Sequence, residues 1–247
     1  MLHLGPLSIH AFGALAAVAV LVGGRIILLR AHRRGIPAQE MFQYCAFVYL
    51  CALAGAVGSK IVLDNYPDFF LNPEHAFRVN LGFRSIGGII GGILGGLLWS
   101  SFHRLSPFET LRRLDIIAYA LPFAWLIGRL GCTLAHDHRG LASTSWIAVK
   151  FPEGPRYDLG LIEFLFLILV VIAFPIIDRR PHPVGFYFGL YGVIYGGFRI
   201  WLDTLHVQPL RFYGGAIGVF IALLGWAAML FFERSRARVV EPAPAAV

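Results

Sequence analysis

The sequence predicts an all-α integral membrane protein with about seven transmembrane helices, its N-terminus outside and its C-terminus in the cytoplasm. Hydrophobic residues make up 57% of the 247 residues, charged residues only 14%, and the mean hydropathy is +0.70. These values are typical of polytopic membrane proteins. The second observation is spacing, because apolar segments of about the 20 residues that a helix needs to cross a bilayer recur along the chain. The seven predicted spans cover approximately residues 8–29, 41–63, 85–103, 113–134, 159–177, 183–204 and 213–233.

The orientation follows from the basic residues between the spans. Most of them fall in alternate loops and in the C-terminal segment, at Arg30, Arg33, Arg34, Arg104, Arg112, Arg113, Arg179, Arg180, Arg234, Arg236 and Arg238. The positive-inside rule places these segments in the cytoplasm and the N-terminus outside. We therefore expect one transmembrane domain over residues 1–238, with external loops at about 64–84 and 135–158, and a disordered tail at 239–247.

Charge and cysteine content argue against a nucleic-acid-binding protein and against a disulfide-stabilised protein. The formal charge of +7 comes largely from residues that flank apolar segments, where they set topology and contact anionic head groups, so nucleic-acid binding is not expected. Cys45, Cys51 and Cys132 lie in or next to apolar segments without paired spacing, which argues against a disulfide framework. The first apolar run lacks a basic region before it and continues to about Leu29, so we interpret it as a span and not as a cleaved signal peptide.

The third span carries pairs of glycines at every fourth position, from Gly87-Gly88 through Gly95-Gly96. Such a pattern gives one helix face on which another backbone or a lipid tail can approach closely. Helix packing alone accounts for this pattern, and a cavity-lining role is an additional hypothesis.

The fourth span ends in an unusual polar stretch, LIGRLGCTLAHDHRG, over residues 126–140. It places Arg129, Cys132, His136, Asp137 and His138 at the end of an apolar helix. A polar or charged group costs several kcal/mol in hydrocarbon unless a partner meets it, so this cluster is a candidate functional site.

A second polar cluster lies on the sixth span. Tyr195, Arg199 and Asp203 follow at intervals of four residues and His206 follows three residues later, so the four share one helical face. On the fifth span, Asp158 is expected to cap the helix, and Glu163 lies inside the membrane, where it needs a partner such as Arg129 or Arg199.

Arg129 and Arg199 lie near the outward ends of their predicted spans. Guanidinium groups bind phosphate through two hydrogen bonds and stay charged at physiological pH, so we expect them to bind an anionic phospholipid. If phosphate is a leaving group, the arginines would stabilise its departure while a histidine or carboxylate takes the proton of the nucleophile. His10, at the start of the first span, is either an interfacial residue or a member of the site.

Four motifs resemble the bacterial prolipoprotein diacylglyceryl transferase family. Gly128-Arg129-Leu130-Gly131 and the polar stretch that follows resemble the family signature G-R-x-G-N-F-x-N-x-E. The others occur in the family's order: Ile9-His10-Ala11-Phe12-Gly13 resembles I-H-W-Y-G, Ser85-Ile86-Gly87-Gly88 resembles F-H-G-G, and Tyr195-Gly196-Gly197-Phe198-Arg199 resembles Y-G-x-F-R.

The resemblance implies an enzyme of the bacterial inner membrane that needs no cofactor. Members of that family transfer a diacylglyceryl group from phosphatidylglycerol to the lipobox cysteine of a preprolipoprotein and release glycerol phosphate. By position, Arg129 and Arg199 would hold the phosphate, and Tyr195 and Asp203 would orient them. Asp203 and His206 stand where that family has an acidic and a basic residue. Apart from the resemblance, we expect His206 and Glu163 to belong to the substrate-binding site, and Tyr195 is also a candidate catalytic residue.

Several family positions differ in this chain. Cys132 and Ala135 replace the signature asparagines, Asp137 replaces the glutamate, and Ile86 and Phe12 replace the family's histidine and tyrosine. His136, Asp137 or His138 is therefore the expected proton acceptor. A metal on the H-D-H triplet is a weaker hypothesis, because neighbouring residues seldom chelate one ion and the sequence shows no third ligand.

Two alternatives to the transferase remain open at this point. One is a divergent paralogue with another acceptor, and the other is a non-catalytic phospholipid-binding membrane protein that has kept the arginines. Cys132 itself is either a nucleophile or a buried, inert thiol.

Overall fold

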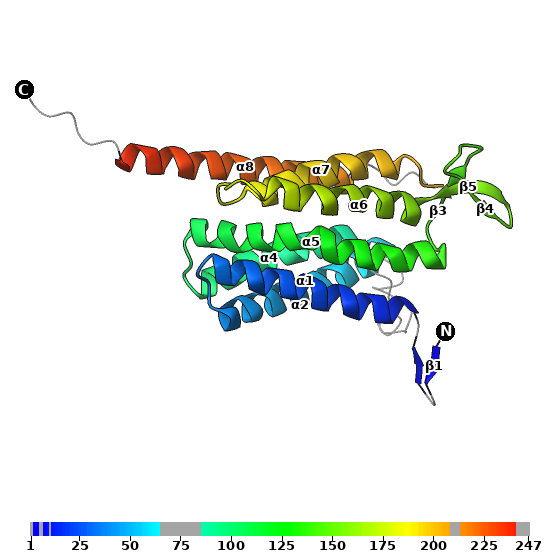
Figure 1. The fold of residues 1–247 in the computed structure, drawn as a ribbon, viewed down its shortest axis with the longest axis horizontal. Coiled ribbons are helices and arrows are strands. Elements are labelled where there is room, and N and C mark those ends of the chain that lie inside the picture. The colour runs from blue at the N-terminus through cyan, green and yellow to red at the C-terminus, as the bar shows by residue number, and fades with distance from the viewer. Residues whose placement is uncertain (1, 5–6, 10, 65–84, 208–212, 241–247) are drawn as a thin grey trace, which may run out of the picture. The chain divides into compact units, whose positions relative to one another are not determined.

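The computed structural model describes residues 2–4, 7–9, 11–64, 85–207 and 213–240 (Figure 1). Seven helices and two small sheets occur in this part of the chain. The helices are α1 (Ala11–Arg33), α2 (Ala38–Asp64), α4 (Ser85–Phe102), α5 (Pro107–Ala135), α6 (Leu159–Ile177), α7 (Phe186–Asp203) and α8 (Tyr213–Val240). Each of the seven predicted spans coincides with one of these helices, so the mostly helical fold is confirmed.

Four of the helices are long and apolar enough to cross a bilayer by length and composition. They contribute the segments Gly13–Arg33, Ala38–Ser59, Pro107–Ala135 and Leu159–Ile177. Shorter apolar segments occur at Gly87–Phe102 and Gly218–Ala227. The protein is thus a multi-pass membrane protein.

Five short strands were not predicted. Strands β1 (Leu2–Leu4) and β2 (Leu7–Ile9) form an antiparallel hairpin, so the first helix begins at Ala11 and not at residue 8. Strands β3 (Arg139–Ala142), β4 (Val149–Phe151) and β5 (Gly154–Asp158) form an antiparallel sheet in the order β3-β5-β4, where we expected an irregular loop. The three-residue strands are too short to show the alternating pattern from which a strand is predicted, and the sequences RGLA of β3 and GPRYD of β5 do not alternate between apolar and polar residues.

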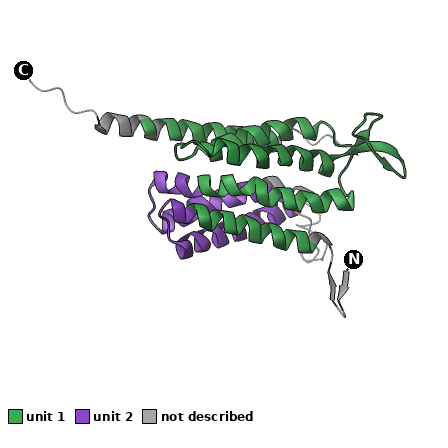
Figure 2. Ribbon diagram, in the orientation of Figure 1, with its two compact units in different colours: residues 1–30, 114–247 green, residues 31–113 purple. Residues whose placement is uncertain are grey.

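The chain divides into two compact units, residues 31–113 and residues 1–30 with 114–247 (Figure 2). In the unit of residues 31–113, which is purple in Figure 2, α2 and α4 pack through the predicted glycine face. A Cβ atom on Gly91 would lie 2.4 Å from the Cys51 carbonyl oxygen, whereas one on Gly92 would lie at an ordinary 3.5 Å from the Ala52 Cβ atom. The first glycine of the pair therefore permits the close contact between the helices.

The unit of residues 1–30 and 114–247, which is green in Figure 2, carries the polar clusters. It contains most of α1 and α5, together with α6, α7, α8 and the β3-β5-β4 sheet. Its core is aromatic, with Tyr119, Phe174, Tyr187, Tyr191 and Tyr195 among the buried residues. At the end of this core opposite to the sheet, Arg30 of α1 pairs with Asp178 just after α6 at 2.6 Å.

The N-terminus of α7 is capped by a residue remote in sequence. Gly185, at the N-cap position, provides no side-chain hydrogen bond. Instead, the buried Asp115 of α5 accepts from the peptide N–H groups of Tyr187 at 2.7 Å and Phe188 at 3.1 Å. A carboxylate at this position satisfies two N–H donors that have no acceptor within the helix, and it interacts favourably with the helix dipole.

Some residues of the predicted loops and tail lie outside the part of the chain that the structure describes. His10, loop residues 65–84 and tail residues 241–247 lie outside the described residues. Residues 239 and 240, which we assigned to the tail, belong to α8.

The glycine face leads to a test by two neighbouring substitutions. Gly91→Ala should lower the unfolding temperature in detergent, because the new methyl group meets a backbone oxygen and overpacking costs about 1 to 3 kcal/mol. Gly92→Ala is the matched control and should leave the temperature unchanged or raise it, since its methyl group fits and alanine favours helix. Equal effects of both substitutions would contradict the assigned packing face.

The remote cap leads to a second test. Asp115→Ala should destabilise the protein by about 1 to 3 kcal/mol, because two buried peptide N–H groups lose their acceptor. Asp115→Asn retains a side-chain oxygen and should lose less. Denaturant unfolding in detergent measures both, and a larger loss for the asparagine variant would exclude the capping role.

Candidate functional site

The site is built around Glu163, a buried carboxylate in the second turn of α6. Its Oε1 atom lies 2.9 Å from Arg129 Nε of α5, and its Oε2 atom lies 3.4 Å from Arg199 Nη1 of α7. The sequence offered either arginine as its partner, and the structure pairs the carboxylate with both. The two guanidinium groups are therefore brought together on opposite oxygens of one side chain.

Two further donors hold the same carboxylate. Trp125 Nε1 and the Tyr195 hydroxyl each donate to Glu163 Oε1 at 2.9 Å. Tyr195 was a predicted site residue, whereas Trp125 was missed. Its position four residues before Arg129 places it on the same face of α5, and this spacing was the signal that could have identified it.

Arg199 is also held by a residue of its own helix. Its Nε atom lies 2.8 Å from Asp203 Oδ1, and His206 Nδ1 lies 3.8 Å from the same oxygen. His206 follows the end of α7, and burial, with a smaller contribution from Arg199, lowers its pKa below the ordinary value. The imidazole is therefore held mainly neutral near pH 7. The four residues predicted to share a face of α7 do lie together.

The geometry leaves donors available on both arginines. Arg129 uses Nε for Glu163 and Nη1 for a long contact of 3.9 Å with Cys132 Sγ. Arg199 uses Nη1 for Glu163 and Nε for Asp203. Within the described part of the chain, Nη2 of each guanidinium has no protein partner, so the pair can offer further hydrogen bonds to a bound anion.

A histidine and a carboxylate meet where α5 ends and α6 begins. His136 has a positive φ of 50° immediately after α5, and its Nδ1 atom lies 2.5 Å from Asp158 Oδ2. Asp158 is fully buried and caps α6 as predicted, with Oδ1 accepting from Leu161 N at 3.1 Å. Its second role, as partner of His136, was not predicted.

This arrangement engages one of the two ring nitrogens of His136. The side chain is 50% exposed, and its ring packs edge-on against Phe151 of β4. Because Asp158 engages Nδ1, Nε2 is the nitrogen that remains available for a proton. A buried carboxylate that orients a half-exposed imidazole in this way is an arrangement suited to general base catalysis.

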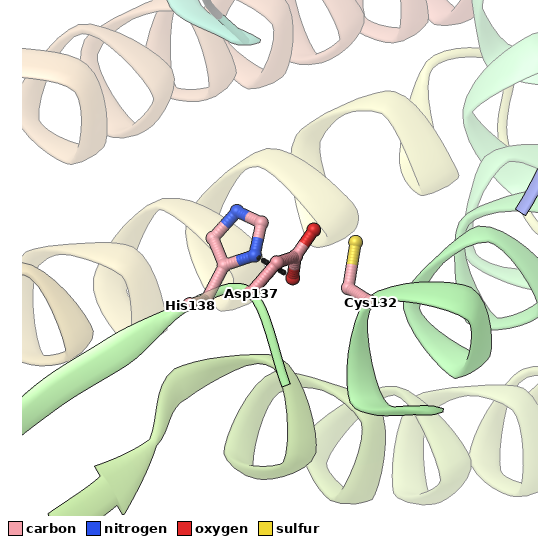
Figure 3. A group of neighbouring side chains, drawn as sticks. All are labelled: Cys132, Asp137 and His138. Carbon is pink, nitrogen blue, oxygen red and sulfur yellow. Dashed lines mark hydrogen bonds and ion pairs between the residues drawn. The ribbon is translucent and has the colours of Figure 1, made fainter. Parts of the chain in front are cut away.

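Asp137 and His138 lie between α5 and β3, and they approach Cys132 in the last turn of α5 (Figure 3). His138 Nδ1 is hydrogen-bonded to Asp137 Oδ1. Hydrogen bonds to Cys132 and Asp137 raise the pKa of His138 above its ordinary value. Cys132 is buried, and the nearby Gly160 allows α6 to pass close to it, since a Cβ atom there would lie 3.4 Å from the Cys132 Cβ atom.

The segment after His138 is fixed to the end of α7. Leu141 N donates to Leu205 O at 2.9 Å, and Gly140 forms an isolated bridge with His206. A Cβ atom on Gly140 would lie 2.8 Å from the Leu205 oxygen, so glycine is needed at this approach. Both polar clusters are thereby held at one end of α5, α6 and α7, beside the sheet (Figure 1).

The central carboxylate leads to a stability prediction. Glu163→Gln should cost about 3 to 5 kcal/mol of folding free energy, because two largely buried guanidinium groups would lose their shared counter-charge. Thermal unfolding in detergent checks this value. Glu153→Gln is the matched control, since that carboxylate pairs with Arg139 on the surface and should contribute less than about 1 kcal/mol. Equal losses in the two variants would contradict the central role of Glu163.

Comparisons with known proteins show the family to which this chain belongs. The family described as Prolipoprotein diacylglyceryl transferase matches residues 1–233. A phosphatidylglycerol–prolipoprotein diacylglyceryl transferase of Sodalis glossinidius is 26% identical to the chain, with 96% of this chain and 89% of the relative covered. Proteins of the same name from Cronobacter sakazakii and Clostridium tetani are 27% and 24% identical, over 85% of this chain and 81% and 85% of their own lengths. The chain therefore belongs to the prolipoprotein diacylglyceryl transferase family.

Proposed function

We propose that this protein transfers a diacylglyceryl group from phosphatidylglycerol to the cysteine thiol of a prolipoprotein lipobox, at the outer face of the bacterial inner membrane. The observation that carries the proposal is the pair of arginines held on opposite oxygens of the buried Glu163. Family membership and the names of the relatives support the same activity. The proposed topology has seven spans, an external N-terminus and a cytoplasmic C-terminus.

Arg129 and Arg199 are the proposed ligands of the lipid phosphate. Glu163 and Asp203 offset their charges and fix their orientation, while Nη2 of each arginine stays available to phosphate oxygens. As the bond between the glyceryl carbon and the phosphate oxygen breaks, negative charge grows on that oxygen. Donors that are already oriented stabilise this charge without reorganisation. Tyr195 is a proposed positioning residue, because it acts through Glu163.

His136 is the proposed base. Its buried partner Asp158 stabilises the imidazolium that forms when Nε2 accepts the proton of the acceptor thiol. The sulfur then forms a bond with the glyceryl carbon, and the electron pair of the broken C–O bond leaves with glycerol phosphate. His206 and His10 are proposed members of the lipid-binding surface, and Asp137 and His138 are proposed to contact the acceptor.

A transfer assay by mass spectrometry tests the proposal. Purified protein, phosphatidylglycerol and a lipobox peptide should yield a peptide that carries a diacylglyceryl group on its cysteine. His136→Ala should reduce the rate by about 10² to 10⁴-fold with lipid binding retained, because only proton transfer is lost. Arg129→Lys should reduce the rate by about 10²-fold or more, because an ammonium group cannot replace the fork of donors.

Two matched variants serve as controls. Arg139→Ala removes an exposed arginine close to the site, and His103→Ala removes an exposed histidine at the end of α4, so both should transfer at the rate of the unaltered protein. No product from the unaltered protein, with phosphatidylglycerol still bound, would reject the transferase and favour the lipid-binding alternative. Transfer to a thiol other than the lipobox cysteine would favour the paralogue with another acceptor.

A further inference from the structure

Cys132, Asp137 and His138 form a cluster of three different ligand types. One ligand atom from each residue lies within 4.8 Å of the other two. Figure 3 shows the Asp137 carboxylate beside the His138 ring, with the Cys132 sulfur facing the same space. Only Asp137 and His138 of the H-D-H triplet belong to this cluster, because His136 pairs with Asp158, and the fold provides the third ligand from Cys132 in the last turn of α5.

The chemistry of these three groups selects a class of ion. A thiolate, an imidazole and a carboxylate together are ligands of zinc, whereas magnesium and calcium prefer oxygen ligands only. In a tetrahedral zinc site with bonds of about 2.0 to 2.3 Å, ligand atoms lie about 3.3 to 3.8 Å apart. The observed cluster needs side-chain adjustments of about 1 Å, with the hydrogen bond between His138 and Asp137 replaced by bonds to the metal.

The surroundings give a cation access to the cluster. They also leave one coordination position of the cation open. Asp137 and His138 are 46% and 40% exposed at the side chain, whereas Cys132 is buried behind them. Arg129 lies 3.9 Å from the sulfur, and the Glu163 carboxylate that it shares with Arg199 offsets part of its charge. Three protein ligands with a fourth position open to solvent are the arrangement of catalytic zinc sites.

We propose that Cys132, Asp137 and His138 bind a zinc-class divalent cation whose fourth position takes the acceptor thiol as a thiolate. This inference rests on the proposed transferase function. Zinc binds thiolates strongly, so coordination would deprotonate the acceptor, with the proton passing to His136 or to water. The sulfur would then attack the glyceryl carbon, and the leaving phosphate would depart with the C–O electron pair, so the metal undergoes no redox change.

Cobalt titration tests the site independently of transfer. Protein stripped with a chelator should bind one equivalent of Co²⁺ and show thiolate-to-cobalt charge-transfer and tetrahedral absorption bands. Cys132→Ser and His138→Ala should weaken binding by about 100-fold or more, since even outer partners of a metal site contribute 10 to 100-fold. Cys45→Ser and His103→Ala are the matched controls and should bind as the unaltered protein does. Thermal unfolding of each variant verifies that it is folded.

The fourth position is tested by adding the acceptor. A lipobox peptide should increase the charge-transfer absorption of the cobalt form, because a second thiolate joins the metal, and a peptide with serine in place of cysteine should not. Absence of the thiolate band, or an equal band in Cys132→Ser, would overturn the metal site. An unchanged band on addition of the peptide would overturn the role of the fourth position.

Transfer by stripped protein separates this inference from the proposed function. If stripped protein transfers the lipid at the full rate, the metal inference fails and the transferase stands. If cobalt binds and responds to the peptide but no lipid is transferred with any metal, the transferase fails and the metal site stands. Loss of transfer on stripping, with recovery on addition of Zn²⁺, would support both.

Discussion

The arrangement of the site depends on one buried carboxylate shared by two arginines. Neither guanidinium would be tolerated in an apolar helix alone, and Glu163 would not be tolerated without them. Three helices are joined by this single side chain, since Arg129 lies on α5, Glu163 on α6 and Arg199 on α7. Trp125 and Tyr195 complete the shell of donors around it. The interaction that stabilises the helix assembly is therefore the same one that orients the proposed phosphate ligands.

The remaining polar groups are ordered outward from this centre. Asp203 holds the second arginine from the end of α7, and Asp158 holds His136 from the start of α6. Beyond them lie Asp137 and His138, which are half-exposed. Burial thus decreases from a charged centre fixed by the fold to groups that an aqueous acceptor can reach, as expected for an enzyme that joins a lipid to a secreted protein.

The helices could be predicted from the sequence because each is a long apolar run. The packing face that contains Gly91 could be predicted because small residues at a fixed spacing usually allow close packing of helices in membranes. The sequence indicated that Glu163 needs a cationic partner but not that two arginines share it, since the pairing depends on how three helices turn toward each other. Asp158 was predicted as a cap from local sequence, but its contact with His136 depends on the way the chain returns through the β3-β5-β4 sheet. Cys132 was predicted to belong to the polar stretch, but its approach to Asp137 and His138 was not, because that approach depends on how the chain turns after the end of α5.

The remote cap of α7 has a consequence for biogenesis. The peptide N–H groups of Tyr187 and Phe188 have their acceptor on Asp115, about 70 residues earlier in the chain. During synthesis α5 leaves the ribosome first, so these donors reach their acceptor only when α7 packs against a helix that is already present. The N–H groups of the first turn of α7 can therefore be fully hydrogen-bonded only after α7 has packed against α5. Their protection from hydrogen exchange thus reports locally how far the assembly of the helices has progressed.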